Sequence, residues 1–364
     1  MRIAVDARPL VHPTTGIGRY TRALLARLAA GTHEILLYSH APLSPDRTFG
    51  LGVRHGRGAS PALSTLYAQT HFARWARHDR ADLFWSPRHH LPVGLGDMPS
   101  VVTIHDLVWR LYPETMIRLG RLAEAWLMPR ALRQASSVIA VSNATARDLD
   151  RFYPDVSSKV VVIPEASDLE PPALVPCTRG DPYLLFVGTM EPRKNLGAVL
   201  EAFSRLRTRG VRSHRLVIAG NAGWKTRDLE RALRATEGVE LVGSPDDERL
   251  ASLYAGAAAV VVPSLYEGFG LPVAEAMSFG IPVITSTVSS LPEVAGDAAL
   301  LVDPASSDAI ADAMQRIIAE PELRAELARR GKARAAELSW ERAAAATLEV
   351  FEGVGRTRNS PGRR

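Results

Sequence analysis

The 364-residue chain passes twice through the same alternation of short apolar segments and longer amphipathic segments. In the first pass we expect strands at 3–6, 34–38, 83–85, 101–104, 138–141 and 160–163, and helices near 17–30, 61–79, 119–135 and 143–152. In the second pass we expect strands at 183–187, 215–219, 239–241, 259–262, 283–285 and 300–302, and helices near 195–209, 227–236, 246–255, 271–279, 306–319, 321–336 and 340–353. Such alternation predicts parallel sheets that helices cover on both faces. Because the chain is too long for one ordinary core, the sequence predicts an α/β protein with two Rossmann-like domains facing each other across a cleft.

The boundary between the two passes lies in a proline-rich segment. Glu170-Pro171-Pro172 interrupts any periodicity, and Arg179-Gly180-Asp181-Pro182 is typical of a turn. We therefore predict a first domain at 1–165, a linker at 166–182, a second domain at 183–339, a C-terminal helix at 340–355 that packs back on the first domain, and a disordered basic tail at 356–364. Ligands are expected at the carboxyl ends of the strands.

Charge is divided unevenly between the two halves. Residues 1–165 carry 20 Lys/Arg and 13 Asp/Glu, whereas residues 166–355 carry 20 and 26. The basic half suggests a phospholipid surface or a phosphate-bearing ligand, although solvated surface arginines explain the charge equally well. The acidic half and the lack of aromatic residues between the basic ones argue against a nucleic-acid binder.

The sequence contains no pattern of a membrane span or signal peptide and only one cysteine, and these features bear on the location and the redox chemistry of the protein. No apolar run approaches the roughly 20 residues that a membrane span needs, and the N-terminus does not have the pattern of a signal peptide. We therefore predict a cytoplasmic protein. Cys177 is the only cysteine, so no disulfide framework and no cysteine-based zinc site is expected.

The segment 262–276, VPSLYEGFGLPVAEA, places two glutamates around a glycine-rich helix start. A helix would begin at Leu271, with Pro272 in its first turn. Gly268 and Gly270 let the backbone approach a ligand closely, and the helix N-terminus offers N–H groups to an anion. Carboxylates accept bidentate hydrogen bonds from neighbouring hydroxyls. The whole string therefore indicates a phosphate flanked by sugar hydroxyls, whereas either glutamate alone would be an ordinary surface residue.

The string from Glu267 to Glu275, E-G-F-G-L-P-V-A-E, resembles the signature of retaining glycosyltransferase family 4. The resemblance covers nearly the whole chain, and it implies the GT-B fold with the active site between two domains. It also implies that Glu267 holds hydroxyls of the donor sugar and that Glu275 holds the ribose. Donor contacts are implied for the residues between them, namely Gly268, Phe269, Gly270 and Leu271.

The segment 186–196, FVGTMEPRKNL, follows the first strand of the second pass and precedes a helix. A glycine at a strand end and two adjacent cations at a helix start suit a diphosphate, because cations disfavour a helix N-terminus that lacks an anion. The resemblance assigns Gly188, Arg193 and Lys194 to the donor diphosphate. Many family members carry arginine directly after the glycine, where this chain has Thr189, so the clamp would rest on Arg193 and Lys194.

Two motifs of the first pass are less specific. The loop TTGIGRY at 14–20 is a common glycine turn on its own, and the resemblance places Gly16 and Gly18 against the donor phosphates and the acceptor. His105 follows the strand at 101–104, and the resemblance places a histidine here beside the donor sugar. We interpret His105 as a group that positions the sugar and supports the transition state. Asp106 would orient it, contact the acceptor or cap a helix.

Three further observations carry less weight. The strand-end loops at Asn221 and Val242 resemble loops around the nucleotide base, although glycine turns explain them equally well. The stretch 54–90 is rich in arginine and histidine, which favours a partly basic face near the acceptor or a membrane. His89 and His90 do not have metal-ligand spacing, because adjacent side chains point apart.

Together these features predict a metal-independent hexosyltransferase without a cofactor. The resemblance to bacterial mannosyltransferases favours GDP-mannose as donor and a glycan or polyprenyl-diphosphate-linked acceptor, used in bacterial polysaccharide biosynthesis with peripheral contact with the inner face of the membrane. No Asp-x-Asp sequence follows a strand where a metal-dependent sugar transferase would need one. No catalytic nucleophile stands out either, so we expect the acceptor hydroxyl to attack the sugar on the face that the diphosphate leaves. The alternatives are a sugar-nucleotide epimerase of the same fold and a non-catalytic sugar-nucleotide-binding protein.

Overall fold

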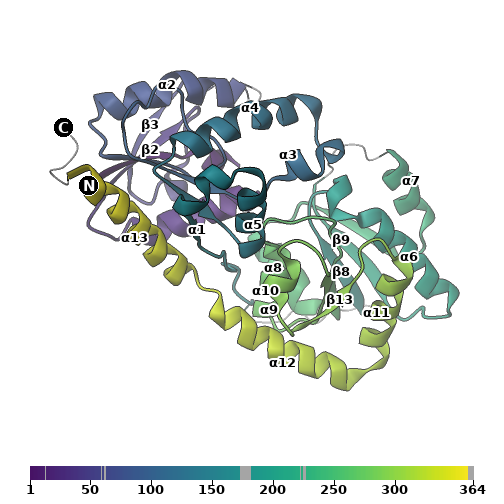
Figure 1. Ribbon diagram of the computed structural model, residues 1–364. Coiled ribbons are helices and arrows are strands. Elements are labelled where there is room, and N and C mark those ends of the chain that lie inside the picture. Colours follow the sequence, from purple (N-terminus) through teal and green to yellow (C-terminus); the bar gives the residue numbers. More distant parts are fainter. Residues whose placement is uncertain are drawn as a thin grey trace. The chain divides into compact units, whose positions relative to one another are not determined.

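The computed structural model describes residues 1–12, 14–58, 60, 63–172, 182–221, 223 and 227–359. The chain divides into two compact units, coloured along the sequence in Figure 1. Unit 1 contains Met1–Arg110, Arg118–Glu165 and the C-terminal segment from Trp340, and unit 2 contains Leu111–Ile117 and Ala166–Ser339. The segment Leu111–Ile117, which we assigned to the first domain, therefore belongs to unit 2.

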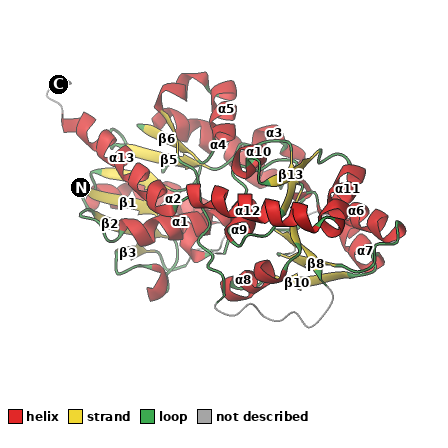
Figure 2. Ribbon diagram, turned by 90° about the horizontal axis from the view of Figure 1, so that it is seen from below, coloured by secondary structure: helices red, strands yellow, loops and turns green. Residues whose placement is uncertain are grey.

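Unit 1 is built on one parallel sheet of seven strands in the order β3-β2-β1-β4-β5-β6-β7. The strands are β1 (Arg2–Asp6), β2 (Glu34–Ser39), β3 (Gly52–His55), β4 (Leu83–Ser86), β5 (Ser100–Ile104), β6 (Ser137–Ala140) and β7 (Val160–Val162). The helices are α1 (Gly16–Leu28), α2 (Ser64–His78), α3 (Val108–Leu111), α4 (Arg118–Gln134), α5 (Asn143–Phe152) and α13 (Trp340–Asn359). Helices flank the strands in both views (Figures 1 and 2), as a buried parallel sheet requires.

Strand β3 was not among the six strands that the sequence predicts in this half. Its sequence is Gly-Val-Arg-His, and none of its four residues is fully buried. A polar four-residue strand gives no apolar run, because an edge strand packs only on one side. It pairs with β2 at the sheet edge, with Leu37 opposite Val53.

The C-terminal helix α13 packs against α1 within unit 1. Trp340 and Phe351 are buried, with ring centroids 5.8 Å from Tyr20 and 5.4 Å from Trp85. Arg27 of α1 donates from Nε to Glu341 at 2.7 Å. The helix runs to Asn359, beyond the predicted end at 355, so the predicted tail begins as helix and its residues 360–364 lie outside the described part of the chain.

Unit 2 carries a parallel sheet of six strands in the order β10-β9-β8-β11-β12-β13. The strands are β8 (Tyr183–Val187), β9 (Arg215–Ala219), β10 (Val239–Gly243), β11 (Ala259–Val262), β12 (Val283–Ser286) and β13 (Ala299–Val302). The helices are α6 (Leu196–Thr208), α7 (Arg227–Ala235), α8 (Asp247–Gly256), α9 (Leu271–Ser278), α10 (Leu291–Ala295), α11 (Ser307–Ala319) and α12 (Pro321–Glu337). Its core is aliphatic and aromatic, with Phe186, Phe203 and Met314 almost fully buried.

The two parallel sheets confirm the predicted fold class, an α/β protein with two Rossmann-like domains. Differences from the sequence-based prediction concern short elements and the ends of longer ones. The short helices α3 and α10 were not predicted, since four or five residues are too few for a periodic pattern. Helix α2 was predicted from residue 61 and begins at Ser64, and much of the predicted linker, 173–181, lies outside the described residues.

Candidate functional site

The loop that follows β8 is fixed by an asparagine in an unusual conformation. After Gly188 the chain forms a short 3-10 turn, Pro192–Lys194, and then enters α6. Asn195 has a φ of 61°, and its side-chain amide lies 3.0 Å from the carbonyl oxygen of Pro263 and 2.7 Å from that of Pro304. These bonds hold the loop against the chain that follows β11 and β13, so the two cations before Asn195 have a defined position.

The loop between β11 and α9 is held by two serines and one glycine. Ser289 Oγ accepts from the N–H of Glu267 at 3.1 Å, and Ser290 Oγ lies within hydrogen-bond distance of the carbonyl oxygens of Glu267 and Phe269. Gly270 precedes α9 with a φ of 108°, and a Cβ there would lie 2.7 Å from Leu291. Glycine is therefore required by the backbone conformation and by the packing of this side chain.

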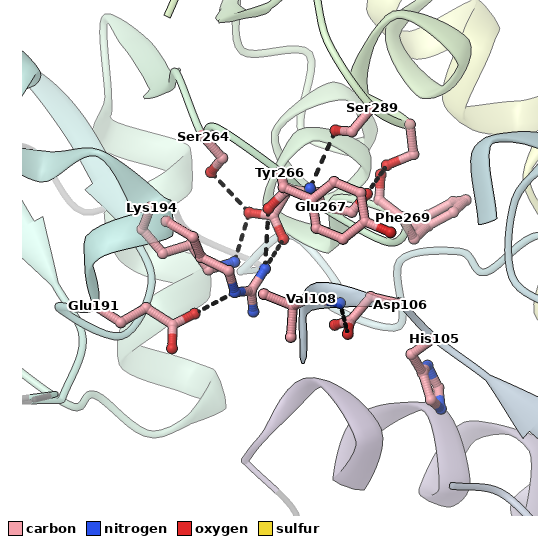
Figure 3. Close-up of polar contacts among 12 residues, drawn as sticks. His105, Asp106, Val108, Glu191, Lys194, Ser264, Tyr266, Glu267, Phe269 and Ser289 are labelled. Carbon is pink, nitrogen blue, oxygen red and sulfur yellow. Dashed lines mark hydrogen bonds and ion pairs between the residues drawn. The ribbon is translucent and has the colours of Figure 1, made fainter. Parts of the chain in front are cut away.

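The two loops meet in one buried cluster of charged side chains, which we call the Glu267 network (Figure 3). Lys194 Nζ donates to Glu267 Oε1 at 2.6 Å, and Ser264 Oγ donates to the same oxygen at 2.8 Å. Arg193 Nη1 donates to Oε2 at 2.9 Å, and Arg193 Nε pairs with Glu191 at 2.6 Å. A backbone bond of 2.8 Å from Leu265 to the carbonyl oxygen of Arg193 joins the same loops. The structure thus brings together the three residues at the centre of the predicted donor site.

The carboxylate of Glu267 is held in its charged form. Burial acts to raise its pKa, but the charges of Lys194 and Arg193, with hydrogen bonds from Lys194 and Ser264, outweigh burial and lower the pKa to about 2. Three donors leave part of its acceptor capacity unused, because each carboxylate oxygen has two lone pairs. The group can therefore accept a further hydrogen bond from a hydroxyl.

The remaining donor-site candidates of unit 2 lie around this network or at neighbouring strand ends. Glu275 is buried in α9 and accepts from the Tyr254 hydroxyl at 2.7 Å. Asn221 is exposed after β9, and its carbonyl oxygen accepts from the N–H of Met190 at 3.0 Å. Val242 lies inside β10. The other candidates have these places: Gly188 directly follows β8, Gly268 and Phe269 are buried before α9, and Leu271 is its first residue.

His105 sits at the carboxyl end of β5 in unit 1, and both of its ring nitrogens are bound. Nε2 lies 2.9 Å from the carbonyl oxygen of Pro87, and Nδ1 lies 3.0 Å from Glu165 Oε1. Both partners are acceptors, so both bonds form only when both nitrogens carry hydrogen or when Glu165 carries the proton. The ring is 8% exposed and packs edge-on to Tyr20. These bonds fix the ring within unit 1, while its contact with a donor sugar stays a prediction.

Two more histidines join the same site through one carboxylate from α4. Glu124 lies 3.3 Å from Nδ1 of His89 and 3.0 Å from Nε2 of His90, and His89 Nε2 accepts from the N–H of His105 at 3.1 Å. Burial lowers the pKa of His90, whereas at His89 the charge and hydrogen bond of Glu124 outweigh burial and raise the pKa. We call His89, His90, His105, Glu124 and Glu165 the histidine cluster.

Charged residues also gather at the carboxyl ends of the neighbouring strands β1 and β4, whose register places Val5 opposite Trp85. Asp6 and Arg8 form a buried ion pair. Arg88 is half-buried, and it forms no ion pair or side-chain hydrogen bond with any residue in the described part of the chain. Burial and the charge of Arg8 lower the pKa of Arg88 to about 10, so the side chain stays cationic at neutral pH.

The other first-half candidates have local structural roles. Gly16 and Gly18 lie in the first turn of α1, where the N–H of Gly18 donates to the capping Thr15 hydroxyl at 3.1 Å. Asp106 accepts from the N–H of Val108 at 3.1 Å (Figure 3). Asp106 thus supports the start of α3, because its side chain accepts from the first N–H of that helix.

Several residues of both clusters were not recognised in the sequence. Ser264 was within the motif that we quoted, three residues before Glu267, and its spacing could have suggested the bond. Glu124 and Glu165 lie 35 and 60 residues from their histidine partners, so no local pattern marks them. Within the described residues, no three His, Cys, Asp or Glu side chains group as metal ligands, and none of the helices there combines the length and apolarity of a membrane span.

Comparisons with known proteins identify the family of this chain. The family model described as Glycosyltransferase Family 4 matches residues 14–171, and the one described as Glycosyl transferases group 1 matches residues 177–334. The chain is 32% identical to the O-antigen chain mannosyltransferase B of Escherichia coli, over 97% of this chain and 100% of that protein.

Solved structures share the fold at low sequence identity. The sucrose-phosphate synthase of Thermosynechococcus elongatus superposes with a TM-score of 0.79 at 22% identity, covering 98% of this chain and 100% of that one. The Anabaena protein Alr3699/HepE, in complex with UDP and glucose, superposes with a TM-score of 0.76 at 19% identity, covering 97% and 100%. At such identities the likeness concerns the fold.

Proposed function

Because this chain belongs to glycosyltransferase family 4, we propose that it is a retaining hexosyltransferase that moves mannose from GDP-mannose to a glycan or polyprenyl-diphosphate-linked acceptor in bacterial polysaccharide biosynthesis. The full-length similarity to an O-antigen chain mannosyltransferase supports the sugar and the type of product. The observation that carries the proposal is the Glu267 network, in which two partly buried cations and one buried carboxylate meet beside the start of α9.

The network suits a sugar attached to a diphosphate. Arg193 and Lys194 provide positive charge, and the N-terminal end of α9 adds a favourable dipole. Stabilising the charge that develops on a leaving group is usually the largest source of catalysis. Glu267 keeps the two cations oriented and offers its remaining lone pair to a sugar hydroxyl, while Glu275 would hold the ribose.

In the proposed reaction, the bond between C1 of the sugar and the diphosphate oxygen breaks, and the diphosphate leaves with the bonding electrons. The acceptor oxygen bonds to C1 from the same face, and its proton passes to an oxygen of the leaving diphosphate. Glu267 is poorly suited to act as a covalent nucleophile, because three hydrogen-bond donors hold its oxygens and lower its basicity. His105, held by Glu165, would position the sugar.

The acceptor would bind to unit 1 through a phosphate. Arg88 supports this assignment, because it is a half-buried cation with no carboxylate partner in the described part of the chain, at the strand edge where ligands bind. A lipid-linked acceptor would bring a cytoplasmic enzyme to the inner face of the membrane. Arg193 and Lys194 supply the positive charge that a metal ion would otherwise bring, so we expect transfer to continue in EDTA.

The donor is tested by thermal unfolding with GDP-, UDP- and ADP-sugars, because a ligand that binds the native state raises its stability. GDP-mannose is expected to give the largest shift, and a larger shift with a UDP- or ADP-sugar would contradict the donor assignment. Radiolabelled GDP-mannose should then label a lipid-linked glycan with an α-linkage retained. Epimerised donor formed without acceptor would point to the epimerase, and binding without any turnover to the sugar-nucleotide-binding protein.

A further inference from the structure

Helix α4 exposes three large apolar side chains on one face. Leu119, Leu122 and Trp126 are 75%, 62% and 65% exposed, and their i, i+3, i+7 spacing places them in one stripe. We call these three residues the α4 apolar face. The opposite side of the helix packs into unit 1 through Leu127, Met128, Ala131 and Leu132.

A stripe of this kind needs an explanation beyond folding. Single exposed apolar residues are normal on a protein surface, but a contiguous group that includes a tryptophan marks an interaction site. The inner face of α4 already supplies the contacts that hold the helix on the sheet, where it packs near β5. The exposed stripe therefore adds nothing to the packing of unit 1.

The charges on α4 indicate the chemistry of the partner. Arg118 precedes the stripe, and Arg133 continues it seven residues after Trp126. Both arginines are exposed, and neither forms an ion pair with a residue that the structure describes. The one acidic residue of the helix, Glu124, is turned inward to His89 and His90. The outer side of α4 is thus apolar and cationic without an exposed carboxylate.

We propose that the α4 apolar face binds the surface of an anionic lipid bilayer. Leucine and tryptophan side chains would enter the headgroup region, and Arg118 and Arg133 would pair with lipid phosphates, as in helices that lie in the membrane interface. The purpose of this contact rests on the proposed function, since a lipid-linked acceptor lies at such a surface. The binding itself requires neither donor nor acceptor.

The test is co-sedimentation of the full-length protein with vesicles of equimolar phosphatidylglycerol and phosphatidylethanolamine. The triple variant Leu119→Gln, Leu122→Gln, Trp126→Gln is expected to bind the vesicles at least about tenfold more weakly than the unmodified protein, because binding scales with the apolar area inserted. Leu241→Gln is the matched control, since Leu241 is a 50% exposed leucine on β10 of unit 2. It should sediment like the unmodified protein.

The charge contribution is tested with the double variant Arg118→Gln, Arg133→Gln and with vesicles of phosphatidylcholine alone. Both changes are expected to weaken sedimentation. The proposal is overturned if the unmodified protein does not sediment with the vesicles, which is the result expected if this face binds another protein instead of a membrane. It is also overturned if the triple variant sediments as well as the unmodified protein. The increase in Tm caused by GDP-mannose is measured for the unmodified protein and for every variant. If GDP-mannose does not raise the Tm of the unmodified protein, the donor assignment is contradicted, but the result with vesicles still holds.

Discussion

The Glu267 network and the histidine cluster occupy the same kind of position, at the carboxyl ends of parallel strands, but they are built from different groups. The network uses arginine, lysine and a glutamate whose pKa of about 2 keeps it charged at every physiological pH. The cluster uses three histidines and two glutamates, with pKa values displaced in opposite directions at His89 and His90. One region carries fixed charge and the other carries charge that can change near neutral pH.

This difference matches the two proposed tasks. A nucleotide diphosphate is the same ligand in every reaction cycle, so a permanently charged clamp suits it. Acceptors differ in shape and charge between glycosyltransferases, and Arg88, which we propose to bind the acceptor phosphate, directly precedes His89 of the histidine cluster. If the comparison is right, changes in unit 2 should abolish transfer broadly, and changes in unit 1 should act on acceptor use or on pH dependence.

The largest effect is expected from breaking the Glu267 network. Lys194→Ala and Glu267→Gln should each lower kcat by about 10²–10³-fold, the usual cost of removing one group that stabilises charge in the transition state. Arg205→Ala is the matched control, because Arg205 lies in the same unit and forms exposed ion pairs with Glu201 and Asp308, neither of which belongs to the network. Turnover is measured with GDP-mannose and a lipid-linked glycan. Near-normal rates of transfer in both variants would contradict the assignment of the Glu267 network as the donor site.

An intermediate effect is expected at Arg88. Arg88→Ala should raise KM for a phosphate-bearing acceptor by about 10–100-fold, because a hydrogen bond to a charged group is typically worth about 1.5–3 kcal/mol. Donor-induced thermal shifts should not change. Arg147→Ala in α5 is the control, since Arg147 is an exposed arginine of the same unit. An unchanged acceptor KM, or an equal loss of donor binding, would argue against a phosphate site in unit 1.

The same two regions explain what the sequence could and could not predict. Each half of the donor site is a short continuous motif, and the strand–helix pattern places both motifs at strand ends. Arg193, Lys194 and Glu267 could therefore be predicted to meet, although their pairing with Glu191 and Ser264 could not. The sheets were predictable for the same reason, because long buried strands leave apolar runs, whereas the polar edge strand β3 leaves none.

The histidine cluster escaped prediction because its members come from separate elements. His105 was selected from its place after β5, but Glu165 follows β7 and Glu124 belongs to α4. Which carboxylate faces which histidine depends on strand order and on how a helix is rotated against the sheet. The spacing of residues along the sequence predicts neither of these properties. The α4 apolar face was missed for a related reason, because a helix that is apolar on two sides has no single clear periodicity.

The smallest expected effect concerns the pH dependence of stability in unit 1. A raised pKa at His89 contributes stability below its ordinary value of 6.5, and this is lost as pH rises through the folded pKa. A lowered pKa at His90 has the opposite sign, since that stability is lost as pH falls below 6.5. The two effects act on opposite sides of pH 6.5 and together place the highest stability near that pH, and Glu124 opposes the effect of burial at both rings.

Glu124→Gln removes this opposition and leaves burial to lower both pKa values. The variant should then lose more stability than the unmodified protein as pH falls through 6.5, with an additional decrease in Tm of about 2–4 °C. Thermal unfolding between about pH 5.5 and pH 7.5 measures this. Glu326→Gln is the control, because Glu326 is a glutamate of α12 that pairs only with Arg329 and Arg330 in the described part of the chain. Parallel Tm curves for Glu124→Gln and this control would show that the histidine cluster does not titrate as a unit, and the contrast with the Glu267 network would then rest on charge identity alone.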